Sequence, residues 1–182
     1  MKGIYKILII ALILFSCDPD RKKKVDSENL TFDTTDSSEL FFKNIRRPYY
    51  DLEEKKEAGL EIFRLQERLI DNKQAIINLS IIFNWRNDTA FIYIEPNNLF
   101  IDASEFTIYW KSKQDEEGIY QFTEGNRDTH FTFAAQLYNS ILAEHQLFYK
   151  KNNVIFPLLD NELERDVFRV TMFDYLRLVN YF

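Results

Sequence analysis

The stretch Ile77-Asn-Leu-Ser-Ile-Ile-Phe-Asn-Trp85 carries the strongest secondary-structure signal in the chain. Its odd-numbered positions, from Ile77 to Trp85, are all large and apolar, and three of the four even-numbered positions are polar. This period of two is typical of a strand with one buried face. A turn signal follows at Arg86-Asn-Asp-Thr89, and Ala90-Phe-Ile-Tyr-Ile-Glu95 then returns as a second strand. We therefore predict an antiparallel hairpin over residues 77–95.

Further strands are predicted on either side of this hairpin. Residues 106–111 and 119–123 form a second hairpin across a charged, glycine-containing turn, and residues 60–65 form a strand before the first hairpin. We expect the folded domain to start near Glu39, with an extended segment up to Tyr50. Pro48 and the charged stretch 51–59 then interrupt the strand pattern.

The hydrophobic period changes in the last third of the chain. Apolar residues between His130 and Lys150 follow a helical rhythm, and a short strand at Val154–Phe156 precedes Pro157. Two interpretations remain open for the end of the chain. Either residues 167–171 form a strand that leads into a last helix, or residues 162–180 form one helix.

This order of elements indicates the fold class α+β. Strands that follow one another through short turns favour an antiparallel β-meander, with the C-terminal helices packed on one face. The alternative is a β-sandwich or barrel with a helical appendage. In either case, residues 39–182 are expected to form a single domain.

The first seventeen residues have the character of an export signal. Lys2 and Lys6 precede or border an apolar run over residues 7–15, which is shorter than the roughly 20 residues of a membrane-spanning helix. Ser16 and the single cysteine, Cys17, follow this run. The stretch Leu14-Phe15-Ser16-Cys17 resembles the lipobox of bacterial lipoproteins.

This resemblance implies a cellular location for the protein. Residues 1–16 would be a signal peptide that is cut before Cys17, and Cys17 would then carry a diacylglycerol. The polar residues that follow predict a flexible tether over residues 17–38. We expect a lipid-anchored protein of the cell envelope, in the outer membrane, although Asp18 is a residue that retains some lipoproteins in the inner membrane. The other interpretation is an uncleaved anchor with an unmodified Cys17.

The composition excludes several classes of function. The chain has 182 residues and a formal charge of −6, so we expect no nucleic acid among its partners. Cysteine and histidine are too scarce for a zinc site, and no calcium-loop pattern occurs, so we expect neither a metal nor a cofactor. A single cysteine also allows no disulfide within the chain.

No motif for catalysis is found. Neither Gly-x-Ser-x-Gly nor Ser-x-x-Lys occurs. The two histidines, His130 and His145, both fall on the predicted helix, where they would lie about 22 Å apart. We therefore predict a protein that is not an enzyme. A hydrolase with an unrecognised carboxylate pair is the alternative.

One cluster suits a binding surface. Arg46, Arg47, Tyr49 and Tyr50 surround the rigid Pro48, and cations beside aromatic rings are typical of interface hot spots. The competing interpretation is the end of a strand with one aromatic ring packed inward. Trp85 and Trp110 both lie in strand patterns, where packing in the core is the more common role of tryptophan.

The sequence as a whole predicts a membrane-anchored envelope lipoprotein that binds rather than catalyses. We expect a non-catalytic accessory subunit of an envelope protein complex, with the lipid supplying location. A sheet edge or the cluster at residues 46–50 would supply the contact with an envelope protein partner. A sugar- or lipid-binding module is the alternative from another class.

Overall fold

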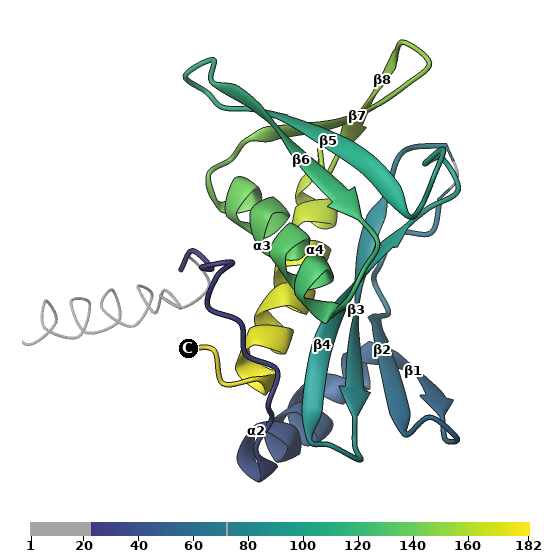
Figure 1. Ribbon diagram of the computed structural model, residues 1–182, viewed down its shortest axis with the longest axis vertical. Coiled ribbons are helices and arrows are strands. Elements are labelled where there is room, and N and C mark those ends of the chain that lie inside the picture. The colour runs from purple at the N-terminus through teal and green to yellow at the C-terminus, as the bar shows by residue number, and fades with distance from the viewer. Residues whose placement is uncertain (1–22, 72) are drawn as a thin grey trace, which may run out of the picture.

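The computed structural model describes residues 23–71 and 73–182, and its strands form two antiparallel four-stranded sheets (Figure 1). Sheet A has the order β1-β2-β3-β4: β1 (Tyr50–Lys55), β2 (Leu60–Leu65), β3 (Ile77–Asn84) and β4 (Thr89–Pro96). Sheet B has the order β6-β5-β7-β8: β5 (Glu105–Lys111), β6 (Glu117–Thr123), β7 (Gln146–Lys151) and β8 (Val154–Leu158). The helical elements are α2 (Asp36–Phe41), the π-helical turn η2 (Phe42–Arg46), the 3₁₀ turn η3 (Arg47–Tyr49), α3 (Arg127–Leu142) and α4 (Glu162–Leu178).

Both predicted hairpins are confirmed. β3 pairs with β4 and β5 pairs with β6, and the predicted strand at residues 60–65 is β2. In the first hairpin the alternating apolar side chains of β3 are buried, as the period of two requires. Trp85 differs from the prediction: it lies in the turn after β3 with 48% of its surface exposed, and the Arg86 guanidinium lies over its ring.

Helix α3 is confirmed, but it ends at Leu142 rather than continuing to Lys150. Glu144 has a positive φ of 57°, and the His145 amide donates back to the Ser140 carbonyl, so the chain reverses there. The residues after His145 form β7, which pairs with β5. His145 therefore lies beyond the helix, and the predicted helical spacing of the two histidines is wrong.

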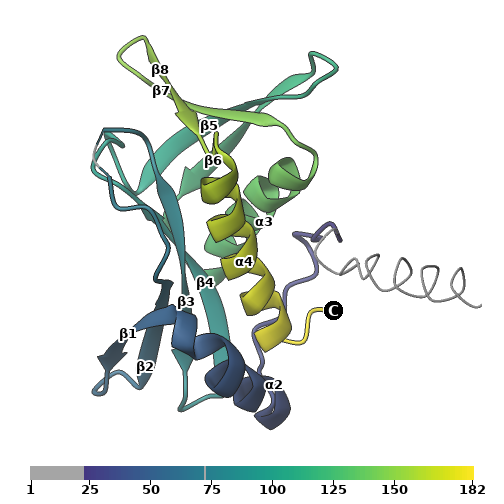
Figure 2. The ribbon, with the colours of Figure 1, turned by 180° about the vertical axis from the view of Figure 1, so that it is seen from behind.

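The end of the chain is one helix, α4, so of the two interpretations the continuous helix is confirmed. Figure 2 shows α3 and α4 together on one side of the sheets, where α4 packs on β3 and β4, and α3 on β4 and β6. The fold class α+β is confirmed, with helices on one face and the meander confined to sheet A. The core between these layers is rich in phenylalanine and tyrosine.

The segment before β1 differs from the prediction in two ways. Residues 36–49 are helical rather than extended, because Thr35 and Ser38 form a reciprocal capping box at the start of α2. The charged stretch 51–59 was predicted to interrupt the strands, but residues 51–55 of it belong to β1 at the edge of sheet A.

Part of the stretch predicted as a tether is packed against the domain. Val25 is buried, and its backbone exchanges two hydrogen bonds with the Asn139 side chain of α3, at 2.9 and 2.7 Å. Phe32 is also buried, against Phe131. Cys17 and the predicted signal peptide lie outside the described residues.

Candidate functional site

The structure divides the predicted binding cluster into two pairs. Arg46 and Tyr50 point inward, and both bind the Asp174 carboxylate of α4. Arg46 Nε donates to both carboxylate oxygens at 2.8 Å, and the Tyr50 hydroxyl donates to Oδ2 at 2.7 Å. Arg47 and Tyr49 point outward and are exposed. Asp174 was not predicted as a site residue, since it lies more than 120 positions away in the chain.

Burial governs the electrostatics of this contact. Asp174 is only 5% exposed, and loss of solvation raises the pKa of its carboxyl, while the hydrogen bonds from Tyr50 and Arg46 oppose that shift. Burial and the Asp174 charge both raise the pKa of Tyr50 far above its ordinary value. Tyr50 therefore stays protonated and donates its hydrogen bond. The contact fixes the η2–η3 turn on α4.

The outer side of the same segment exposes several large apolar side chains. We define the α2–η3 surface as the exposed residues Leu40, Phe41, Ile45, Arg47 and Tyr49. Tyr49 is 56% exposed, and the Arg46 guanidinium lies 5.0 Å from the centre of its ring. Single exposed apolar residues are ordinary on protein surfaces, but four within ten consecutive residues are typical of a contact surface.

Two features hold this segment in place independently of Asp174. The Ser38 hydroxyl donates to the Leu178 carbonyl near the end of α4 at 2.7 Å. Phe42 is buried, with its ring centre 5.1 Å from that of Phe63 in β2. The α2–η3 surface is therefore presented by a segment anchored to both α4 and sheet A.

A serine and a histidine that the sequence did not bring together meet at the end of α3. Ser140 Oγ lies 3.1 Å from His145 Nδ1 and 2.8 Å from the Tyr120 hydroxyl. A nucleophile must reach its substrate, but Ser140 is only 1% exposed. The His145 ring is also stacked on Trp110, 4.7 Å between centres. This arrangement serves packing between α3 and sheet B rather than acyl transfer.

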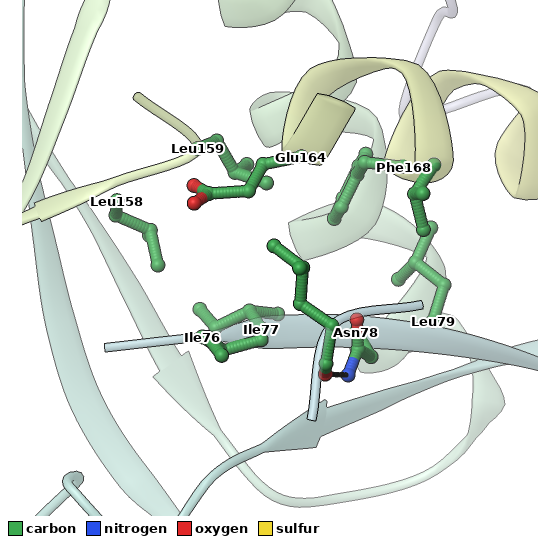
Figure 3. Close-up of a pocket in the computed structure, with 10 residues that line it drawn as sticks. Ile76, Ile77, Asn78, Leu79, Leu158, Leu159, Glu164 and Phe168 are labelled. Atoms are coloured by element: carbon green, nitrogen blue, oxygen red, sulfur yellow. Dashed lines mark hydrogen bonds between the residues drawn. The ribbon is translucent and has the colours of Figure 1, made fainter. Parts of the chain in front are cut away.

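A small hollow lies between sheet A and α4 (Figure 3). Ile76 and Ile77 line its sheet side, and Glu164 and Phe168 line its helix side. It encloses about 10 Å³, close to what one water molecule needs, so it cannot hold a sugar or a lipid.

Glu164, the charged residue of this hollow, has its oxygens occupied. They accept hydrogen bonds from Gln74 Nε2, Asn161 Nδ2 and the Asp160 amide, at 2.9, 2.6 and 3.0 Å. Its own amide donates to Asn161 Oδ1, the cap of α4. Glu164 therefore fixes the start of the helix.

Paired carboxylates do occur on the outer face of sheet A. Arg64 Nη1 donates to Glu53 and its Nε donates to Glu95, each at 2.8 Å. One guanidinium thus holds both acids, which removes the free general acid that glycoside hydrolysis requires. Within residues 23–71 and 73–182 there is no group of three or more histidine, cysteine, aspartate or glutamate side chains placed to hold a metal ion.

Comparison with known proteins returns no relative. No family model, no curated protein and no solved structure matches this chain. Among the described helices, none combines the length and the apolar character needed to cross a bilayer.

Proposed function

We propose that this protein is a lipid-anchored, non-catalytic accessory subunit of an envelope protein complex that binds a protein partner through the α2–η3 surface. One observation carries the proposal. The buried Asp174 holds the π-helical turn η2 and the 3₁₀ turn η3 on α4, and the segment from α2 to η3 exposes the large apolar side chains of Leu40, Phe41, Ile45 and Tyr49 to solvent. A π-helical turn inside a helical segment is uncommon and is frequently found at functional sites.

The anchor rests on the resemblance of the first seventeen residues to a lipobox. A lipid on Cys17 would leave only residues 18–24 between the acyl chains and the packed Val25. Seven residues span at most about 25 Å when fully extended. The domain would then work close to the membrane surface, within reach of other membrane-bound proteins.

The surface itself favours a protein partner over a small ligand. Small-molecule sites are concave and bury most of the ligand, whereas protein interfaces use exposed aromatic and arginine anchors. Tyr49 and Arg47 are anchors of this kind, and Leu40 and Ile45 add apolar area.

The test compares partner recovery for two matched variants of the full chain. The first, Leu40→Ser/Ile45→Ser/Tyr49→Ala, changes only exposed residues of the α2–η3 surface. The second, Ile70→Ser/Leu163→Ser, changes exposed apolar residues elsewhere. Each protein is purified from its native membranes in mild detergent, and the proteins recovered with it are quantified by mass spectrometry.

We expect the parent chain and the control variant to retain a stoichiometric membrane protein, and the surface variant to lose it. Arg46 and Tyr50 are left unchanged because they bind Asp174 and support the fold. Equal recovery with all three chains would eliminate the α2–η3 surface as the contact. A parent chain recovered without any partner would refute the accessory-subunit function.

A further inference from the structure

The two sheets have four edge strands, and each edge poses the same problem. An edge strand has unpaired N–H and C=O groups that can pair with another chain, so soluble proteins usually block such edges. In this structure the edges are β1 and β4 of sheet A and β6 and β8 of sheet B. Three of them are blocked by recognisable means.

The two edges of sheet A are blocked in different ways: β1 by charged side chains, and β4 by other segments of the chain that bond to it. β1 is rich in charged residues, namely Asp51, Glu53, Glu54 and Lys55. β4 is covered by other parts of the chain: the Ala90 amide donates to the Phe32 carbonyl at 2.8 Å. Further along the same strand, the Ile94 amide donates to His130 Nδ1 at 3.1 Å.

The edge at β8 is blocked by proline. Asn152 and Asn153 both have positive φ, so a two-residue turn closes the hairpin on the pair Lys151 and Val154. Hydrogen-bonded pairs alternate from there, which directs the backbone groups of Ile155 and Pro157 to the outer edge. Proline has no N–H, so this edge lacks one of its two donors.

β6 is blocked by none of these means, since Glu117 at its start is its one charged residue. The Ser112 amide donates to the Glu116 carbonyl at 2.8 Å, and the Glu124 amide donates to the Ser104 carbonyl at 2.6 Å. These two bonds show which residue pairs of the β5–β6 hairpin are hydrogen-bonded pairs. Even-numbered residues of β6 therefore bond to β5, and odd-numbered residues direct N–H and C=O groups outward. In the described part of the chain β6 has β5 as its one neighbouring strand. It contains no proline, and the turn of its hairpin projects beyond α3 (Figure 1).

A second copy of β6 suits this edge. In an antiparallel pair centred on Ile119, the outward-facing groups of the two Ile119 residues would bond to each other. Glu117 of each copy would then lie opposite Gln121, so no like charges would face one another. Symmetric pairing of identical surfaces is the commonest way in which soluble proteins form dimers.

The outer face of sheet B supports the same register. Ile119, Tyr109, Phe148 and Pro157 lie opposite one another across all four strands and form an apolar row on this face. Ile119 ends the row at the open edge and is 59% exposed. Pairing at Ile119 would join the rows of two copies and remove apolar area from water.

From the open edge, the blocked edges and this row, we propose that two copies of the protein pair antiparallel through β6, centred on Ile119, to form one continuous eight-stranded sheet. This dimer uses a surface separate from the α2–η3 surface and does not rest on the function proposed above. It leaves that surface free to bind a different protein.

Disulfide trapping tests the register directly. Ile119→Cys and Gln121→Cys are made in the full chain, and membranes are exposed to a mild oxidant. In the proposed register the Cα atoms at position 119 of the two copies lie about 5.5 Å apart, within disulfide range. Position 121 of one copy is offset from position 121 of the other by four residues along the strand, about 13 Å, so thiols placed there could not bond. The parent chain, with Cys17 alone, is the blank.

We expect a covalent dimer with Ile119→Cys and none above the blank with Gln121→Cys. No dimer with Ile119→Cys, or equal dimer with both variants, overturns the proposal.

A charged residue placed on the β6 edge provides a second test, and because the changed side chain is exposed, the fold should be kept. Ile119→Lys places like charges opposite each other in the dimer, whereas Ile155→Lys changes a residue on the same face that is equally exposed, at 60%, on the opposite edge. Sedimentation of the purified full chain in detergent should show dimers for the parent and for Ile155→Lys. Ile119→Lys should raise the dimer dissociation constant by about tenfold or more.

Thermal unfolding at a concentration where the parent is monomeric checks that both lysine variants fold. Unchanged association of a folded Ile119→Lys protein contradicts the proposal. The α2–η3 variant should dimerise like the parent, so this test and the partner-recovery test can fail independently.

Discussion

Replacing Asp174 by alanine should be among the most damaging single changes in this protein. The substitution removes the acceptor of two donors, Arg46 Nε and the Tyr50 hydroxyl. A hydrogen bond to a charged group contributes about 1.5–3 kcal/mol, so two of them amount to about 3–6 kcal/mol. Part of this is offset, because burying the Asp174 carboxylate is itself costly and because Arg46 is 25% exposed and can regain water. We expect a net loss of about 2–4 kcal/mol in the free energy of unfolding.

Urea unfolding followed by tryptophan fluorescence measures this loss, and a double-mutant cycle assigns it. Tyr50→Phe alone should cost about 1 kcal/mol, since Arg46 still binds the carboxylate. Combined with Asp174→Ala, Tyr50→Phe should add little, which gives a coupling energy of about 1 kcal/mol. In a thermal scan the loss for Asp174→Ala corresponds to about 6–12 °C for a chain of this length.

Two results would refute this reasoning. A change of less than about 0.5 kcal/mol for Asp174→Ala is typical of an ordinary surface substitution and would mean that the contact does not hold α4 and the η2–η3 turn together. Additive effects of Tyr50→Phe and Asp174→Ala would mean that the two side chains do not interact. Asp51→Ala is a suitable control, because Asp51 is an exposed acid paired with Arg68 at the edge of sheet A.

Two further predictions concern packing around sheet B and β4. Burial lowers the pKa of His130, whose Nδ1 accepts from the Ile94 amide only when it is unprotonated, so folding favours the neutral ring. The stability that His130 contributes should therefore be complete above its ordinary pKa of 6.5 and be lost as the pH falls below that value. Urea titrations of His130→Gln should lack this part of the pH dependence of stability. A pH profile of His130→Gln that equals the parent's would contradict the prediction. Gly118→Ala should cost about 1–3 kcal/mol, because the new Cβ would lie 2.7 Å from the rigid Trp110 indole. Thermal scans of Gly118→Ala against Gln121→Ala, an exposed change on the same strand, measure that cost, and equal melting temperatures would show that the indole can move.

The sequence predicted the elements whose signals are local. In the hairpin of β3 and β4, the alternation of apolar residues and the turn residues between them act within about twenty positions, and nothing elsewhere in the chain opposes them. The end of α3 was missed because Phe148 and Tyr149 fit a helical rhythm as well as a strand. Their conformation is decided by pairing with β5, which lies far away in the sequence.

The inward contact of the candidate site could not be predicted from the sequence either, because it too depends on a residue far away in the chain. The cluster around Pro48 contains two arginines and two tyrosines, and nothing local distinguishes the members that point inward. Arg46 and Tyr50 are set apart by Asp174, which is 128 and 124 residues away. The buried position of one carboxylate on α4 thus decides which half of the cluster remains available for binding.

The segment before β1 has large apolar side chains on both its inner and its outer side, and this is the strongest physical reason to expect a partner there. Phe42 packs inward against Phe63, while Leu40 and Ile45 point outward into solvent. A helix at the surface of a stable domain normally has one apolar face, and a second apolar face is stabilised only when something else covers it. The domain core is complete without the outward residues, so folding alone does not account for them. A protein that covers Leu40 and Ile45 would account for both faces of the segment.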